Sequence, residues 1–216
     1  MSSRTTFALA HIAGVYGIAD THACNGDPER GAAQLIEGGC RLIQLRAKDW
    51  SEDDILRAGR NIAAQCSGTG TTFVLNDHAH LVAACGASGL HLGQGDQSPT
   101  LARRVVGPNI LIGLSTNSLE NLHHIDPQAD YLAFGPVWDS MHAGAHKHTQ
   151  GLEQLIQARQ LLSSNLPLVA IGGIQADAIP VLQEFNIQAW AVIGAIFNTP
   201  DPVAATKSFI PERVNS

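Results

Sequence analysis

Residues 42–76 read LIQLRAKDWSEDDILRAGRNIAAQCSGTGTTFVLN, and this stretch holds the pattern that decides the fold. It begins with an apolar run at Leu42–Leu45, continues with helical spacing over Ser51–Cys66, and ends on a second apolar run at Phe73–Leu75. Both runs lack regular polar alternation, which is typical of strands covered on two faces in a parallel sheet. The stretch therefore predicts one strand–helix–strand unit.

The same alternation extends along the whole chain. Eight apolar runs predict eight strands, at Val15–Ala19, Leu42–Leu45, Phe73–Leu75, Gly89–Leu92, Leu111–Leu114, Tyr131–Phe134, Leu168–Ile171 and Ala189–Ile193. Helices are expected at Asp27–Glu37, Ser51–Cys66, Ser118–Ile125, Gly151–Leu162, Ala178–Phe185 and Pro202–Phe209.

Eight such units in 216 residues predict an α/β fold of the (β/α)8 TIM-barrel type. We expect one domain over residues 1–216, with its core at about 14–210. An open flavodoxin-like sheet is the alternative, and it normally needs fewer strands.

Composition and charge narrow the class of protein. The net charge is −6 and no run of Lys or Arg exceeds two residues, which argues against a nucleic-acid partner. No apolar segment is long enough to span a bilayer, so a membrane location is not expected. The four cysteines form no CxxC pair and no export signal opens the chain, so we expect a reduced cytoplasmic protein. Assembly into a homo-oligomer is left open.

Polar residues follow the predicted strands, at the barrel end where active sites lie. Gln44, Arg46 and Lys48 alternate along one strand end, so their side chains should point to one side. Arginine and lysine suit a phosphate or diphosphate group. A solvated basic loop with one buried glutamine is the alternative.

Two neighbouring strand ends carry hard oxygen ligands. Asn76 and Asp77 follow the third predicted strand, and Asp96 follows the fourth. Carboxylates beside basic residues suggest Mg²⁺ bridging phosphates. A turn or helix cap is the other interpretation of each residue taken singly.

Glycines mark the ends of the seventh and eighth strands. Gly172 and Gly173 follow one strand, and Ile193 and Gly194 end the next. Small residues there let backbone N–H groups approach a phosphate, although a lone Gly-Gly more often marks a tight turn.

The segment from Trp138 to Gln150 contains three histidines and one lysine: His142, His146, Lys147 and His148. These residues suit metal binding, acid–base chemistry or a lid over the barrel mouth. Another histidine, His91, ends the fourth strand and is expected to be a hydrogen-bonded structural residue.

Taken in order, these segments resemble thiamine phosphate synthase and its relative TenI, a thiazole tautomerase. The resemblance spans nearly the whole chain, and its strongest pieces are residues 44–48, 75–77, 89–96, 112–115, 130–137 and 169–174. It implies a transferase that joins hydroxymethylpyrimidine diphosphate to thiazole phosphate, releases pyrophosphate and forms thiamine phosphate.

The resemblance also implies roles for single residues. The expected metal ligands for Mg²⁺ are Asp77 and Asp96. The expected diphosphate contacts are Arg46, Lys48, Asn76 and Ser115, of which Arg46, Lys48 and Ser115 are expected to be catalytic. Gln44 is expected to contact the pyrimidine. The thiazole phosphate is expected to contact Gly173, Ile193 and Gly194.

The chain departs from the family pattern in two places. Where the family usually shows Thr-x-Thr-Lys, residues 138–143 read WDSMHA, so Ser140 replaces one hydroxyl and Lys147 is the candidate for the missing lysine. Pro136 occupies the position where TenI-type relatives commonly carry a histidine. The alternatives to the synthase are thus a TenI-like tautomerase and a non-catalytic family member that binds a thiamine intermediate or regulates a partner.

Overall fold

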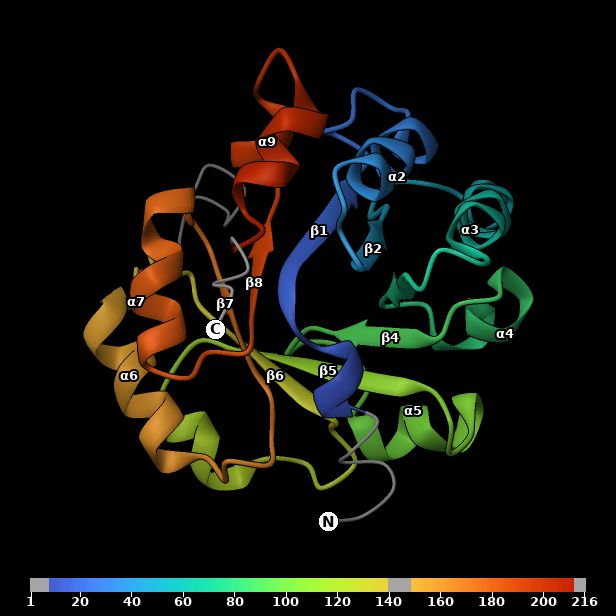
Figure 1. Ribbon diagram of the computed structural model, residues 1–216. Helices are drawn as coiled ribbons and strands as arrows, with labels where there is room; N and C mark the ends of the chain where they lie inside the picture. The colour runs from blue at the N-terminus through green and yellow to red at the C-terminus, as the bar shows by residue number, and fades with distance from the viewer. Residues whose placement is uncertain (1–7, 140–148, 212–216) are drawn as a thin grey trace.

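A computed structural model of the chain describes residues 8–139 and 149–211. Its centre is a closed barrel in which eight parallel strands pair in sequence order and β8 returns to β1 (Figure 1). The strands are β1 Gly14–Asp20, β2 Leu42–Arg46, β3 Thr72–Asn76, β4 Gly89–Leu92, β5 Leu111–Thr116, β6 Tyr131–Phe134, β7 Leu168–Ile171 and β8 Ala189–Val192. The predicted barrel is confirmed, and the open sheet is excluded.

Helices surround the barrel, as Figure 1 shows. They are α2 Pro28–Glu37, α3 Glu52–Cys66, α4 Val82–Cys85, α5 Pro99–Val106, α6 Gly151–Leu161, α7 Ile179–Glu184, α8 Gly194–Phe197 and α9 Pro202–Ser208. In the part of the chain that the structure describes, short 3-10 helices also join the strands, namely η1 Ala79–Leu81, η2 Glu120–His124 and η4 Ala176–Ala178.

Most of the helices expected from the sequence are present, but one has another helix type and others were not predicted. The segment expected as a helix at Ser118–Ile125 is the 3-10 helix η2, so that prediction was wrong in type. The connections α4, α5 and α8 were missed. The α5 signals were in the sequence, since Ser98 caps the helix, Pro99 begins it and Gly107 ends it.

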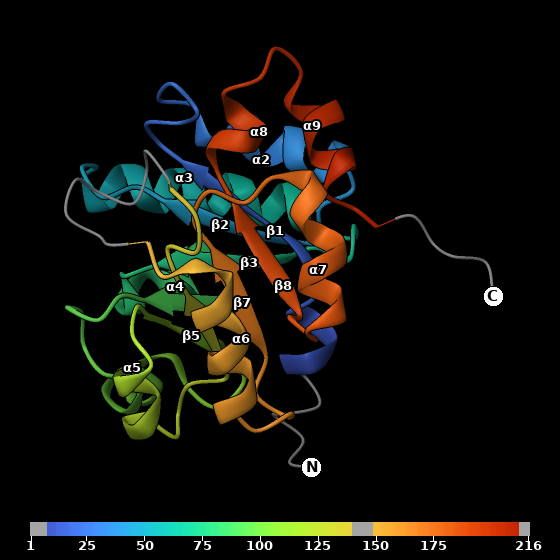
Figure 2. The same cartoon turned by 90° about the vertical axis from the view of Figure 1, so that its left-hand side faces the viewer.

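Two apolar cores result from the strand alternation. Side chains pointing inward fill the barrel, among them Tyr16, Leu42 and Tyr131, while the opposite set packs beneath the helices. Residues 8–11 form a helical turn, and Ala8 and Ile12 join the inner core next to the first residues of the strands. This turn, dark blue in Figure 2, closes the amino end of the barrel.

One glycine makes room for an aromatic ring inside the barrel. A Cβ atom at Gly113 would lie 2.0 Å from Cζ of Tyr131, so only glycine admits the ring at this point of β5. Tyr131 is fully buried, and a buried ring of this size contributes about 1.5–3 kcal/mol of hydrophobic stabilisation. The ring forms part of the floor beneath the site described below.

The remaining structural expectations concern cysteines and membranes. All four cysteines are free thiols, as expected for a reduced protein. Among the described residues, no helix has the length and apolar character needed to cross a membrane.

Candidate active site

A large cavity opens where the strands end. Its volume is about 990 Å³, and residues from all eight strands or the loops that follow them line it. The apolar floor is the inner core, whose members Ile18, Ala133 and Ala191 face the cavity. Polar side chains occupy the carboxyl-end loops, as the barrel geometry predicts.

The strand end of β2 supplies the positive side of the cavity. Gln44, Arg46 and Lys48 all line it, which confirms the prediction that period-two spacing aims them to one side. Nη1 of Arg46 donates a hydrogen bond to Oδ2 of Asp20, a carboxylate of which 2% is exposed. Oδ1 of Asp20 accepts hydrogen bonds from the backbone N–H groups of His22 and Ala23, at 3.0 and 3.1 Å. Arg46 is thus held by a carboxylate that its own loop fixes in place.

Asp77 and Asp96 form the negative part of the cavity. Burial raises the pKa of Asp77 to about 6, and interaction with Asp96 adds to the rise, while the charges of Lys48 and Arg46 oppose it. The backbone N–H of Asp77 donates to the carbonyl of His91 at 2.9 Å. Oδ2 of Asp96 accepts a hydrogen bond from the backbone N–H of Gly93 at 2.7 Å, which anchors its turn. Two carboxylates therefore converge beside two cations.

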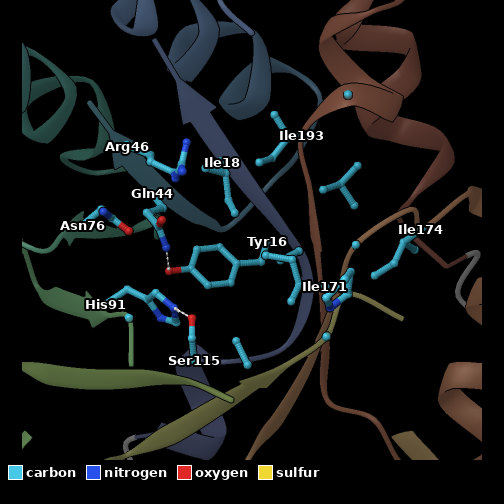
Figure 3. Close-up of a pocket in the computed structure, with 18 of the residues that line it drawn as sticks. Tyr16, Ile18, Gln44, Arg46, Asn76, His91, Ser115, Ile171, Ile174 and Ile193 are labelled. Carbon is cyan, nitrogen blue, oxygen red and sulfur yellow. Dashed lines mark hydrogen bonds between the residues drawn. The ribbon is translucent and has the colours of Figure 1, made fainter. Parts of the chain in front are cut away.

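A chain of hydrogen bonds crosses the floor of the cavity. Figure 3 shows its two ends, the contact of Gln44 with Tyr16 and that of His91 with Ser115. Nε2 of Gln44 donates to the hydroxyl of Tyr16 at 2.7 Å, and this hydroxyl lies 3.0 Å from that of Tyr131. The Tyr131 hydroxyl lies 3.0 Å from Nδ1 of His91, whose Nε2 lies 2.9 Å from Oγ of Ser115. The chain joins the strand ends of β2 and β5 across the barrel.

Only one direction of donation leaves no buried tyrosine hydroxyl hydrogen in this chain without a partner. Because Gln44 donates to Tyr16, Tyr16 donates to Tyr131, and Tyr131 donates to Nδ1 of His91. Nε2 of His91 then carries the proton and donates to Ser115. Desolvation lowers the pKa of His91 from 6.5 to about 4, so the ring stays neutral at pH 7. The hydroxyl hydrogen of Ser115 is left to donate into the cavity.

Glycines form the opposite wall. Gly172, Gly173 and Gly194 line the cavity together with Ile193. Gly173 has φ +66°, and a Cβ there would lie 2.5 Å from the carbonyl oxygen of Asp139. The backbone turn at this wall thus requires glycine, as the strand-end pattern suggested.

The structure places ten of the twelve predicted site residues in this one cavity. They are Gln44, Arg46, Lys48, Asn76, Asp77, Asp96, Ser115, Gly173, Ile193 and Gly194. Ser140 and Lys147, like the histidines at 142, 146 and 148, lie outside the described residues. The individual roles stay predictions.

Sequence reasoning missed the tyrosines and the partner of Arg46. Tyr16 and Tyr131 fall in apolar runs, where a buried hydroxyl that needs a partner is the only available signal. Asp20 was recognised as a strand-end residue, but its pairing with Arg46 was not foreseen.

Fold and cavity together define a (β/α)8-barrel protein with an active-site-like cleft at the carboxyl ends of its strands. A family model described as "Thiamine monophosphate synthase" matches residues 15–196, and the chain belongs to this family.

Comparisons with individual proteins indicate the same family. A thiamine-phosphate synthase of Phocaeicola vulgatus is 37% identical over 180 residues, which is 82% of this chain and 86% of the relative. One from Laribacter hongkongensis is 34% identical over 195 residues, 89% of this chain and 92% of the relative. The structure of thiamine phosphate pyrophosphorylase from Pyrococcus furiosus superposes with a TM-score of 0.82 at 26% identity, covering 93% of this chain and 95% of that one.

Proposed function

We propose that this protein is a thiamine phosphate synthase, which joins hydroxymethylpyrimidine diphosphate to thiazole phosphate and releases pyrophosphate. One observation carries the proposal. A single cavity combines the Arg46 and Lys48 cations, the Asp77 and Asp96 carboxylates and a glycine wall at Gly173. This is a set suited to two phosphorylated substrates held side by side.

Mg²⁺ is part of the proposal, and the donor set fits it. Asp77 and Asp96 supply hard carboxylate oxygens. Burial raises the pKa of Asp77, and the neighbouring Asp96 carboxylate adds a repulsion that a divalent cation would relieve. Asn76, the last residue of β3 and the neighbour of Asp77 in the sequence, lines the same cavity. When bound, Mg²⁺ would supply charge neutralisation for the departing diphosphate.

The chain's own residues account for binding and orientation. Arg46, fixed by Asp20, and Lys48 are placed to hold diphosphate oxygens. Ser115 is oriented by His91 to donate its hydroxyl hydrogen into the cavity. Gln44, whose amide nitrogen is engaged by Tyr16, is assigned to the pyrimidine, while Gly173 and Gly194 are assigned to the thiazole phosphate. Catalysis then rests on stabilising the leaving group and positioning the nucleophile.

The direct test is an assay with both substrates and Mg²⁺ that measures thiamine phosphate and pyrophosphate together. Equal amounts of the two products are expected from the native chain. Arg46→Gln should lower kcat/KM for the diphosphate about tenfold to hundredfold, because a charge-assisted contact is lost. Arg57→Gln, on the exposed face of α3, is the matched control. A folded native chain that forms neither product contradicts the proposal.

Ser140 and Lys147 are assigned to substrate binding as predictions from the sequence. Lys147→Ala should impair use of the pyrimidine diphosphate more than binding of thiazole phosphate.

Pro136 speaks against the tautomerase as the alternative function. Its side chain is buried, lines the cavity and cannot transfer protons. A cytoplasmic location rests on the sequence alone, and assembly into a homo-oligomer stays an open possibility.

A further inference from the structure

Three ligand-type side chains form a group of their own beside the cavity. Glu52, His78 and His80 each present one ligand atom, and these atoms all lie within 4.8 Å of one another. Oε1 of Glu52 and Nε2 of His80 are 3.0 Å apart. The two imidazole rings meet edge to face, with centroids 6.1 Å apart. None of these three residues belongs to the lining of the cavity.

The barrel brings these residues together from separate segments. Glu52 is the first residue of α3, which follows β2, and the two histidines flank Ala79 directly after β3. Because β2 and β3 are paired neighbours, the segments leaving their carboxyl ends lie side by side. The backbone of both segments is anchored independently of these side chains: Ser51 caps α3, and the N–H of Asp77 is bonded to the carbonyl of His91. The three side chains therefore project from fixed points.

The donor atoms select a class of ion. Two imidazole nitrogens and one carboxylate oxygen suit Zn²⁺, Ni²⁺ or Co²⁺, whereas Mg²⁺ prefers oxygen ligands alone. The group thus differs in chemistry from the Asp77 and Asp96 pair. Ligands at about 2 Å from a shared ion lie roughly 3–4 Å apart, so atoms within 4.8 Å of one another need only a small closure.

The side chains have the freedom to make that closure. The side chains of His80 and Glu52 are 56% and 62% exposed, so rotation about their side-chain bonds meets little packing. Exposure also leaves room for water in the remaining coordination positions, as in an open metal site. His78 is less exposed and supplies the more fixed of the two imidazoles.

We propose that Glu52, His78 and His80 form a binding site for a divalent transition-metal ion, separate from the Mg²⁺ site. A bound ion would link the start of α3 to the segment that follows Asp77. It would therefore stabilise the loop at the edge of the cavity without touching the substrates. The proposal does not depend on which reaction the cavity catalyses.

The test is a calorimetric titration of untagged protein with Zn²⁺, in excess Mg²⁺ to occupy oxygen-only sites. Histidines at 142, 146 and 148 are a competing source of ligands, so the titration is also made in a background where all three are Gln. In that background we expect one equivalent to bind. Glu52→Gln, His78→Gln and His80→Gln should each lower the affinity roughly tenfold or more. His123→Gln, an exposed histidine on η2, is the matched control and should change nothing.

A second measurement separates ligand loss from misfolding. Zn²⁺ should raise the melting temperature of the background protein and of His123→Gln, because an ion that binds only the folded state stabilises it. The three site variants should melt like the background protein without metal and gain little from Zn²⁺. Zn²⁺ binding that is undiminished in all three folded variants, or no binding by the background protein, would overturn the proposal.

Discussion

Nε2 of His91 lies 2.9 Å from Oγ of Ser115, and Nδ1 of the same ring lies 3.0 Å from the hydroxyl of Tyr131. Both ring nitrogens are therefore used inside a buried chain of hydrogen bonds. The chain sets which nitrogen carries the proton, and that nitrogen in turn sets the direction of the Ser115 hydroxyl. A residue expected to be structural thus orients one expected to be catalytic.

The buried His91 makes stability depend on pH. Its pKa falls from 6.5 to about 4 on folding, so the unfolded chain binds the proton first and stability is lost as pH falls below about 6.5. Lowering the pH from 7.5 to 5.5 should reduce the free energy of unfolding by about 1 kcal/mol through this one group. Urea unfolding at the two pH values should therefore show a larger loss for the native chain than for His91→Gln. The exposed control His123→Gln should follow the native chain, and equal losses in all three would contradict the assignment.

The Asp20 carboxylate is expected to act through Arg46. Asp20→Asn keeps an oxygen for the turn at His22 and Ala23 but removes the charge that holds the guanidinium. We expect kcat/KM for the pyrimidine diphosphate to fall about tenfold, the effect of weakening one charge-assisted contact, with little change in KM for thiazole phosphate. The matched control is Asp27→Asn, whose carboxylate also accepts a backbone N–H but caps the start of α2. Equal loss for both substrates would argue against a role in placing Arg46.

Asp77→Asn tests the metal assignment with the least backbone disturbance. Asp77 has φ +66°, a conformation that asparagine tolerates better than alanine does. Activity that depends on Mg²⁺ should fall about tenfold to hundredfold, through loss of a charged ligand.

Stability gives the independent readout for Asp77→Asn. Because folding raises the pKa of Asp77, its ionised form disfavours the native state above the unfolded pKa. In Mg²⁺-free buffer at pH 7.5 the variant should therefore melt no lower than the native chain. Asp53→Asn, on the exposed face of α3, should leave both activity and melting temperature unchanged. Full activity in folded Asp77→Asn would remove this residue from the metal site.

Gly173→Ala should disturb the glycine wall through a steric clash of the added methyl group, in addition to the strain of its positive φ. Its Cβ would lie 2.5 Å from a carbonyl oxygen and 2.7 Å from the backbone of Trp138, so the turn must move. We expect KM for thiazole phosphate to rise about tenfold or more. Gly68→Ala has a similar φ of +74° with nothing within 4 Å, and should cost only about 1 kcal/mol of stability without affecting KM. Comparable KM values in the two variants would count against a phosphate contact at Gly173.

Local pattern was enough to determine the strands, most helices and one wall of the site. Gln44 and Arg46 both line the cavity because side chains two residues apart on a strand share a face. This two-residue spacing can be read directly from the amino-acid sequence. The ends of β2, β3 and β4 could likewise be assigned to one rim, because parallel strands share a direction. The 3-10 helix at Glu120–His124 could not be told from an α-helix, since its few residues satisfy either hydrogen-bond pattern.

Long-range pairing was decided only by tertiary structure. Tyr16 and Tyr131 are 115 residues apart and meet because β1 and β6 both face the inside of a closed barrel. Asp20 meets Arg46 through the register of β1 against β2, and Glu52 meets the two histidines through the neighbouring loops. Each contact depends on barrel closure and strand register, which no local window of sequence contains. The residue types and strand ends were therefore determined by the sequence alone, while the proton positions and partners were set by the fold, because burial and distance exist only once the chain has closed on itself.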